Sequence, residues 1–306
     1  MTAETGYMGF VGVTTSSSSI MTIFPKWARA LGLPTDRLIS HDIPLGAPPE
    51  VYRDIVESIR RDPLHYGCLV TTHKMAVFKN AFDLFDGMDE LAETFQEVSS
   101  ISKRGSSLLG AAKDPITVRV ALEEFLDTDH FSRTGGHALI LGSGGAGSAL
   151  SYTLGIREDI PERIISTARS QENLDHLREL HNRAGIPPTR VQYVLVRSDE
   201  ADALVAALPE GSLVVNATGM GKDRPGSPLG DDVLFPQHAV VWEFNYRGSL
   251  EFLHQARAQA TLRGLDVQDG WRYFIHGWTK VIADVFDIPM PPALVDDLAQ
   301  MADSTR

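Results

Sequence analysis

The chain has 306 residues, 43% of them hydrophobic, and its 28 basic and 40 acidic side chains give a formal net charge of −12. This acidic balance argues against nucleic acid or an anionic membrane surface as the main partner, since both attract basic protein surfaces. No apolar run approaches the roughly 20 residues of a membrane-spanning helix, and the N-terminus lacks the basic start of a secretion signal. We therefore expect a cytoplasmic protein, long enough for two domains.

Cysteine usage excludes two further features. Cys68 is the one cysteine, so an intrachain disulfide cannot form. No cluster of cysteine and histidine has the spacing of metal ligands, and we expect no metal. Because Cys68 lies inside an apolar run, we expect it to be a small buried residue.

The N-terminal part, residues 6–115, alternates between strand-like and helix-like segments. "YMGFVGV" and "GCLVT" are typical of strands, whereas "IFPKWARALG" and "VYRDIVESIRR" are typical of helices. From residue 137 the alternation becomes regular, with apolar and often β-branched runs of strand length. These runs span residues 137–141, 163–167, 191–196, 212–218 and 239–244.

The segments between these runs have helical spacing. "QENLDHLRELHNRAG" places three leucines on one helix face and ends on Gly185, a plausible C-terminal cap. Strands and helices that alternate at this spacing predict a parallel sheet with helices on both faces. The last apolar segment, residues 270–286, has helical spacing and many aromatic residues, and we expect a core-packing helix.

The turn "GSGGAG" contains Gly142, Gly144 and Gly147 in the spacing G-x-G-x-x-G. The first glycine permits a tight turn, the second lets the backbone approach a pyrophosphate, and the third lets helix and strand pack closely. The pyrophosphate would lie at the helix N-terminus, where unpaired N–H groups favour an anion. The alternative is a purely structural turn, but its place between a strand and a helix favours a nucleotide site.

The end of the next predicted strand indicates which dinucleotide binds. An acidic residue there would accept a hydrogen bond from the ribose of NAD, but this chain has Arg169 and Ser170 and no carboxylate before Glu172. Arginine pairs well with a 2′-phosphate. NADP is therefore favoured over NAD, unless Arg169 is only a solvated residue at a helix cap.

Seven motifs in the same order resemble those of the shikimate/quinate dehydrogenase family over nearly the whole chain. The segments that carry the resemblance are "GCLVTTHK", "EVSSIS…LLGAAKD", "GSGGAG", "ARS", "VNATGMG", "EFNYRGSLEFL" and "DGWRYFIHGWTKVIADVF". The resemblance implies an α/β fold with an N-terminal substrate-binding domain and a Rossmann-type, doubly wound NADP-binding domain. We expect residues 1–115 and 270–306 to form the first domain, to which the C-terminal helix returns, and residues 116–269 to form the second.

The resemblance also implies a catalytic pair. Lys74 falls on the family's catalytic lysine and Asp114 on the aspartate that completes its dyad. Interconversion of an alcohol and a ketone needs a group that gives or takes a proton, and a lysine oriented by a carboxylate can serve. On residue type alone, Lys74 would be a surface charge.

Further contacts are implied at other motif positions. Thr71 and Tyr246 are expected near the substrate, and the loosely matched serine cluster places Ser17 and Ser19 on the family's carboxylate-binding serines, unless this cluster is a flexible polar turn. Asn216, Thr218, Gly219 and Met220 would line the nicotinamide side of the cofactor. The predicted cofactor contacts as a whole are Gly142, Gly144, Gly145, Ala146, Gly147, Thr167, Arg169, Ser170, Asn216, Thr218, Gly219, Met220 and Gly270.

Four positions depart from the family pattern. Asparagine and glutamine positions are occupied here by Leu69, Ser99, Ala112 and Gly277. Leucine and alanine cannot hydrogen-bond a ring hydroxyl, and a hydroxyl desolvated without a partner weakens binding. Shikimate itself is therefore an uncertain substrate, although Ser99 could replace part of the lost hydrogen bonding.

Two histidines each have two interpretations. His276, beside the glutamine position and four residues before Lys280, is either a substrate contact or a packed core residue. His73, beside Lys74, is either a functional group or a packed residue.

These observations predict an NADP-dependent oxidoreductase acting on shikimate or a shikimate-like cyclic carboxylate. The alternative is a catalytically silent relative that senses NADP or a pathway metabolite. We expect a monomer or homodimer with a small-molecule substrate, and neither nucleic acid nor membrane as partner.

Overall fold

The computed structural model describes residues 6–197, 200–222 and 224–305. They divide into two compact units: unit 1 comprises residues up to Lys113 together with Ile275 onward, and unit 2 comprises Asp114–Phe274. Each unit holds a six-stranded sheet among its described residues.

Unit 1 is built around a mixed sheet with the strand order β2-β1-β3-β5-β6-β4. The three strands β1, β2 and β3 are parallel to one another, whereas β5 is antiparallel to both β3 and β6. Its elements are β1 Tyr7–Gly12, α1 Ile20–Leu31, β2 Leu38–Asp42, α2 Pro49–Arg61, β3 His65–Val70, α3 Lys74–Ala81, the 3₁₀ helix Phe82–Leu84, β4 Gly87–Met88, α4 Glu90–Phe95, β5 Ser100–Arg104, β6 Ser107–Ala111, α11 Trp271–Phe286 from Ile275 onward, and α12 Pro292–Asp303.

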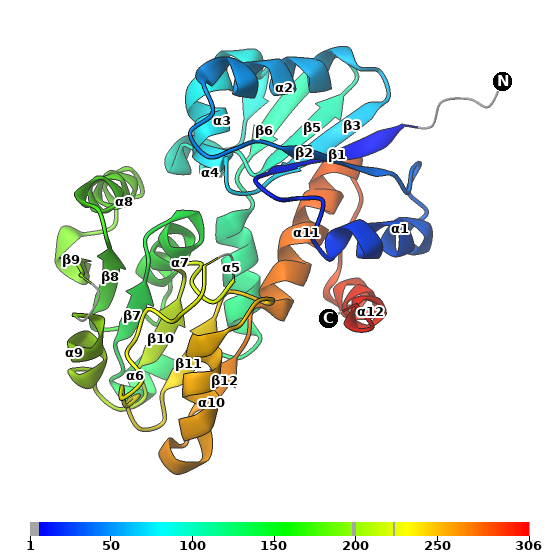
Figure 1. Ribbon diagram of the computed structural model, residues 1–306. Helices are drawn as coiled ribbons and strands as arrows, with labels where there is room; N and C mark the ends of the chain where they lie inside the picture. The colour runs from blue at the N-terminus through cyan, green and yellow to red at the C-terminus, as the bar shows by residue number, and fades with distance from the viewer. Residues whose placement is uncertain (1–5, 198–199, 223, 306) are drawn as a thin grey trace. The chain divides into compact units, whose positions relative to one another are not determined.

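Helices cover both faces of this sheet (Figure 1). Apolar side chains of α2 and α3, among them Val56 and Val77, pack in one core cluster with Val11 of β1 and Cys68 of β3. On the other face, the ring of Trp278 in α11 lies edge-on against Phe10, with 4.8 Å between centroids. The buried Cys68 agrees with the expectation from the sequence.

Unit 2 is a wholly parallel sheet with the strand order β12-β11-β10-β7-β8-β9. Counted from β7, this is the doubly wound Rossmann order, with the switch point between β7 and β10. Its elements are α5 Asp114–Glu123, α6 His130–Thr134, β7 Ala138–Leu141, α7 Gly145–Ile156, β8 Ile164–Ala168, α8 Gln171–Arg183, the 3₁₀ helix Pro188–Arg190, β9 Val191–Leu195, α9 Ala201–Ala206, β10 Leu213–Asn216, β11 Val240–Glu243, α10 Glu251–Arg263, β12 Asp266–Gln268 and the start of α11.

The predicted strands from residue 137 onward all form. Strands β7, β8, β10 and β11 are buried throughout, and strands buried on both faces appear in the sequence as continuous apolar runs. The predicted helix after β8 forms as α8, and Leu174, Leu177 and Leu180 are its buried stripe. Its C-cap residue is Ala184, and the predicted glycine, Gly185, follows with a φ of +69°. The α/β fold class is confirmed.

Candidate functional site

In unit 1, Thr15, which precedes the serine cluster, and Thr71 both lie near Gly12. The strands β1 and β3 are parallel neighbours, so the segments that follow their carboxyl ends lie side by side. A Cβ added to Gly12, the last residue of β1, would lie 2.5 Å from Cγ2 of Thr71 and 2.7 Å from Cγ2 of Thr15. Glycine at this position therefore lets the two segments approach.

Asp42 holds the serine cluster in place. Its Oδ1 accepts hydrogen bonds from the main-chain N of Thr15 at 2.7 Å and from the Thr15 hydroxyl at 2.5 Å. These hydrogen bonds lower the pKa of the Asp42 carboxyl. Ser17 is exposed and bonds its own loop, whereas Ser19 is the half-buried residue before α1. The negative charge of Asp42 opposes a second carboxylate beside this loop.

Lys74 is the first residue of α3, directly after the loop that follows β3. Its main-chain N donates to the carbonyl of Thr71 at 3.1 Å, and its carbonyl accepts from the N–H of Val98 at 3.1 Å. These bonds fix the backbone of Lys74 between β3 and the segment that leads into β5. The side chain is half-buried.

His73 is an internal residue. It is 3% exposed, its Nε2 lies 2.8 Å from the carbonyl of Ile43, and its Nδ1 lies 3.4 Å from the hydroxyl of Tyr52. Both ring nitrogens therefore have protein partners, which favours the packing interpretation of this residue.

Three of the four positions that lack the family amides are buried, whereas Gly277 is half-buried. Ser99 is 2% exposed, and its hydroxyl donates to the carbonyl of Ala111 at 3.4 Å and accepts from the N–H of Lys113 at 2.7 Å. Ala112 and Leu69 are also buried. The Ser99 hydroxyl is thus bonded to the main chain, and its role as a substrate contact stays a prediction.

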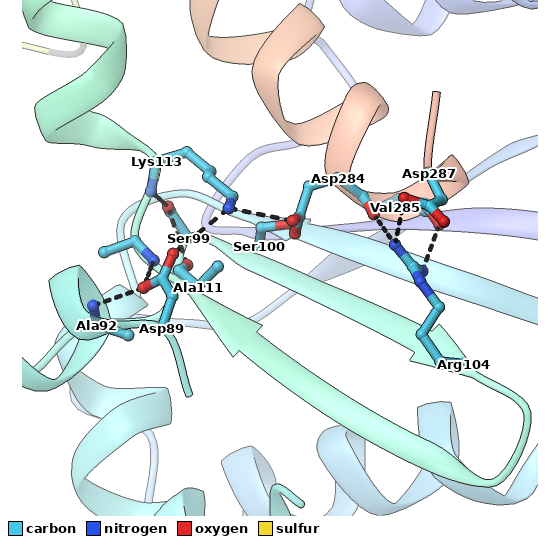
Figure 2. Close-up of polar contacts among 11 residues, drawn as sticks. Asp89, Ala92, Ser99, Ser100, Arg104, Ala111, Lys113, Asp284, Val285 and Asp287 are labelled. Atoms are coloured by element: carbon cyan, nitrogen blue, oxygen red, sulfur yellow. Dashed lines mark hydrogen bonds and ion pairs between the residues drawn. The ribbon is translucent and has the colours of Figure 1, made fainter. Parts of the chain in front are cut away.

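Lys113 was not singled out by its sequence context, yet it is the centre of a charged cluster in unit 1 (Figure 2). Its Nζ lies 3.0 Å from Oδ1 of Asp284 and 3.4 Å from Oδ2 of Asp89. Asp114 follows directly, is 8% exposed and begins α5. No local pattern predicts this cluster, since Asp284 comes from the far end of the chain.

Helix α11 carries His276, Lys280 and Asp284 at intervals of four residues, so the three share a face. Asp284 Oδ2 accepts from the hydroxyl of Ser100 at 2.6 Å, which turns this face toward the start of β5. His276 is 6% exposed. Its burial agrees with a packed residue, and its role as a substrate contact stays a prediction.

In unit 2, the glycine-rich turn lies at the switch point of the sheet. Gly142 has a φ of +101°, and a Cβ on it would lie 2.8 Å from the carbonyl oxygen of Ala217, after β10. A Cβ on Gly147 would lie 2.0 Å from the carbonyl oxygen of Gly142. The turn therefore requires glycine at both positions, for the mechanical reasons inferred from the spacing.

Gly144 differs from these two glycines. It is the N-cap residue of α7, its φ is −75°, and a Cβ on it would meet nothing within 4 Å. Gly145 and Ala146 form the first turn of the helix. This open backbone at a helix N-terminus fits the pyrophosphate of a dinucleotide.

The end of β8 lies beside the same turn. The hydroxyl of Thr167 accepts a hydrogen bond from the N–H of Gly142 at 3.2 Å, so this residue supports the turn from within. Arg169 and Ser170 are exposed immediately after β8, and Ser170 caps α8 by accepting from the N–H of Asn173 at 3.4 Å. The cap is therefore Ser170, and Arg169 precedes it.

The loop after β10 is held by a chain of hydrogen bonds. Asn216 donates from Nδ2 to Glu243 Oε2 at 2.7 Å, and its Oδ1 accepts from the hydroxyl of Thr218 at 2.7 Å. The Thr218 hydroxyl in turn accepts from the N–H of Met220 at 3.1 Å. Gly219 takes a φ of +73° within this loop. The predicted nicotinamide-side residues therefore form one ordered loop beside the glycine turn.

Tyr246 and Gly270 occupy the region between β11 and α11. The Tyr246 ring lies 4.2 Å from that of Phe274 and 5.8 Å from that of Trp271, measured between centroids. A Cβ on Gly270 would lie 2.1 Å from the carbonyl oxygen of Phe244, so close backbone packing requires glycine here.

Among the described residues, no group of three or more His, Cys, Asp or Glu side chains could hold a metal ion. Within the same ranges, no helix is both long and apolar enough to span a membrane.

The parallel sheet of unit 2, with its glycine-rich turn at the switch point, defines a Rossmann-type nucleotide-binding class of protein. Comparison with curated proteins identifies the particular family. The chain is 31% identical over 235 residues to a shikimate dehydrogenase (NADP(+)) of Symbiobacterium thermophilum, covering 75% of this chain and 73% of that protein. A protein of the same name from Sphingopyxis alaskensis is 27% identical over 296 residues, covering 94% and 93%. The chain belongs to the shikimate dehydrogenase family.

Solved structures share the fold. A quinate dehydrogenase from Corynebacterium glutamicum in complex with NAD superposes with a TM-score of 0.75 at 20% identity, covering 98% of this chain and 99% of that one. A 5-ketofructose reductase of Gluconobacter superposes with a TM-score of 0.72 at 17% identity, covering 99% and 100%. No family profile matches the chain.

Proposed function

We propose that this protein is an NADP-dependent oxidoreductase that interconverts a secondary alcohol and a ketone on shikimate or a related small cyclic carboxylate. The observation that carries the proposal is the family membership, since its relatives are named as NADP-dependent shikimate dehydrogenases. Residues 1–115 with 270–306 would bind the substrate, and residues 116–269 would bind the cofactor.

Lys74 is the proposed proton-transfer residue and Asp114 its partner. NADP, when bound, supplies the hydride chemistry. Loss of a hydride from an alcohol carbon releases the hydroxyl proton, and a neutral lysine amine can accept it. A carboxylate orients the amine and shares its hydrogen bonds. The fixed backbone of Lys74 at the start of α3 supports this role.

The residues of the glycine turn fit the proposed cofactor. The open backbone at Gly144, where an added Cβ would meet nothing within 4 Å, leaves room for a pyrophosphate above the N-terminus of α7. Arg169, exposed at the end of β8, provides a guanidinium for the 2′-phosphate of NADP. Thr167, whose hydroxyl accepts a hydrogen bond from the N–H of Gly142, supports this turn.

Two features of unit 1 bear on the identity of the substrate. Ala112 and Leu69 provide no amide for a ring hydroxyl, and Asp42 adds a negative charge beside the serine cluster. The fold alone does not fix the substrate, and a 5-ketofructose reductase shares it. A panel of substrates is therefore needed.

The test is turnover of the purified protein with NADP(H), followed by the absorbance of the reduced nicotinamide. The panel contains shikimate, quinate, dehydroshikimate, their deoxy analogues and uncharged ketoses and polyols. Turnover of a cyclic carboxylate supports the proposal, and turnover of only uncharged sugars corrects its substrate class. Tight NADP binding without hydride transfer to any compound favours the alternative, a silent sensor, which the missing amides support.

A further inference from the structure

The charged cluster around Lys113 fixes the segment that leads into Asp114. The Lys113 side chain is 15% exposed, and its two partners, Asp284 and Asp89, are 25% and 34% exposed. Partly buried ion pairs of this kind are screened less than surface pairs and hold their groups more firmly. The three charges come from the segment between β6 and α5, from α11 and from the N-cap position of α4 (Figure 2).

Both carboxylates are held by further hydrogen bonds. Asp89 Oδ1 accepts from the N–H of Ala92, as a helix cap, at 2.7 Å, and from the N–H of Ala112 at 3.1 Å. Asp284 accepts from Ser100 at 2.6 Å. The cluster is therefore a network rather than a single pair, and removing one charge leaves the others without their partner.

The residues just before Asp114 are fixed at three atoms. The N–H of Ala112 is bound by Asp89, the N–H of Lys113 donates to Ser99 Oγ at 2.7 Å, and the Lys113 ammonium is bound by two carboxylates. Since Asp114 is covalently the next residue, its backbone leaves from a segment with little freedom. A carboxylate that orients a proton-transfer group needs such precision, because a misplacement of about 1 Å can cost about 100-fold in rate.

We propose that Lys113, through its ion pairs with Asp284 and Asp89, is a positioning residue that sets the location of Asp114 for proton transfer. This inference rests on the proposed function. Lys113 is not itself a reacting group, since its ammonium is already bound by two carboxylates.

The chain provides a matched control on the same helix. Arg104, at the opposite end of β5, donates to the main-chain carbonyls of Asp284 at 2.5 Å and Val285 at 3.1 Å. It therefore also attaches α11 to the β5–β6 hairpin with one positive charge, as Figure 2 shows. Its contacts do not involve residues 112–114. Arg104→Met should weaken the helix attachment without moving Asp114.

The experiment compares Lys113→Met, Asp284→Asn and Arg104→Met. For each variant we would measure the unfolding midpoint, the NADP dissociation constant, kcat, KM and the pH profile of kcat, using the substrate that the wild type turns over. Lys113→Met should lower kcat by about 10- to 100-fold, shift the pH profile, and leave NADP binding unchanged. Asp284→Asn should act in the same way, and the double variant should lose less than the product of the two single losses. Arg104→Met should keep kcat within about twofold of wild type.

Equal losses of kcat in Lys113→Met and Arg104→Met would overturn the inference, because the cluster would then be only structural. If Lys113→Met does not fold, Asp284→Asn provides the same comparison with Arg104→Met. A wild type that turns over no compound of the panel contradicts the proposed function and with it this inference. Turnover by the wild type with an unaffected Lys113→Met contradicts the positioning role alone.

Discussion

The side-chain amide of Asn216 donates a hydrogen bond to the carboxyl group of Glu243 at 2.7 Å, and neither residue has any exposed surface. Glu243 also accepts from the main-chain N of Asn245 at 2.7 Å. Burial raises the pKa of Glu243 to about 7, although these hydrogen bonds act in the opposite direction. The loop predicted to line the nicotinamide is thus anchored on a buried carboxyl group.

The stability of Glu243→Gln relative to wild type should increase as the pH rises. The pKa of Glu243 is higher in the folded state than its ordinary value of 4.5. Below 4.5 the carboxyl is protonated in both states, and as the pH rises toward 7 the unfolded state loses its proton first, which favours unfolding. The advantage of the variant should grow by at most about 1.4 kcal/mol per pH unit in this interval.

Urea denaturation of both proteins at pH 4.5, 6 and 7.5 measures this difference. Glu123→Gln, which removes an exposed carboxyl from α5, controls for the loss of one negative charge. A constant difference between wild type and Glu243→Gln across the three pH values would contradict the prediction.

Acid should destabilise the protein through His65. This residue is 3% exposed, its Nε2 has no hydrogen-bond partner among the described residues, and burial lowers its pKa to about 4. Above pH 6.5, its ordinary pKa, His65 is neutral in both the folded and the unfolded state. As the pH falls from 6.5 toward 4, His65 becomes protonated in the unfolded state but stays neutral in the folded state. Stability is therefore lost over that window.

The check is to compare unfolding free energies at pH 7.5 and 5 for wild type, His65→Gln and His254→Gln. His65→Gln should show the smaller loss on acidification, even if it is less stable at both values. His254 is exposed on α10, so His254→Gln should lose as much unfolding free energy between pH 7.5 and 5 as wild type does. An equal loss of unfolding free energy in all three proteins would contradict the role of His65 in acid destabilisation.

Gly144→Ala should separate cofactor binding from folding. A Cβ at this position meets nothing within 4 Å, so the unfolding midpoint should change little. A pyrophosphate approaching the N-terminus of α7 would meet the new methyl group, so NADP affinity should fall about 10-fold or more. Gly147→Ala, whose Cβ would lie 2.0 Å from a carbonyl oxygen, should instead destabilise the fold. Titration calorimetry measures the NADP affinity of each variant, and thermal unfolding measures its midpoint. Unchanged NADP binding by Gly144→Ala would show that the turn is not part of the cofactor site.

Lys74→Met should lower kcat by about 100- to 10,000-fold, the usual contribution of general acid–base catalysis. NADP affinity should stay unchanged, because the predicted cofactor contacts lie in unit 2. Lys79→Met, which removes an exposed lysine from the same helix α3, is the matched control. A kcat of Lys74→Met within about twofold of wild type would exclude the dyad.

Arg169→Ala should weaken the binding of NADP more than the binding of NAD. The guanidinium is the proposed partner of the 2′-phosphate, which only NADP carries. We expect KM for NADP to rise about 10- to 100-fold while KM for NAD changes little. Arg178→Ala, an arginine further along α8, controls for net charge. Parallel changes for both cofactors would indicate that Arg169 does not read the phosphate.

The sequence predicted unit 2 more completely than unit 1, and the reason is physical. Parallel strands buried on both faces appear as apolar runs, and the glycine spacing identifies the turn. The hairpin of β5 and β6 was not recognised as two strands, because its polar and glycine residues hide the alternation. Likewise, Ser100 and Asp284 are 184 positions apart, and no local pattern links residues so distant in sequence.

The interruption of unit 1 by unit 2 determines the order in which the chain can fold during synthesis. Domains fold as units while the ribosome extends the chain. Unit 2, a continuous segment ending at Phe274, emerges complete before α12 exists. Unit 1 is made first but finished last: Trp27, fully buried in the finished protein, donates to the carbonyl of Leu298 at 2.8 Å. Until the last helices leave the ribosome, the apolar surface around Trp27 and Phe10 lacks the residues of α11 and α12 that cover it. This surface of unit 1 therefore stays exposed to solvent after unit 2 has been completed.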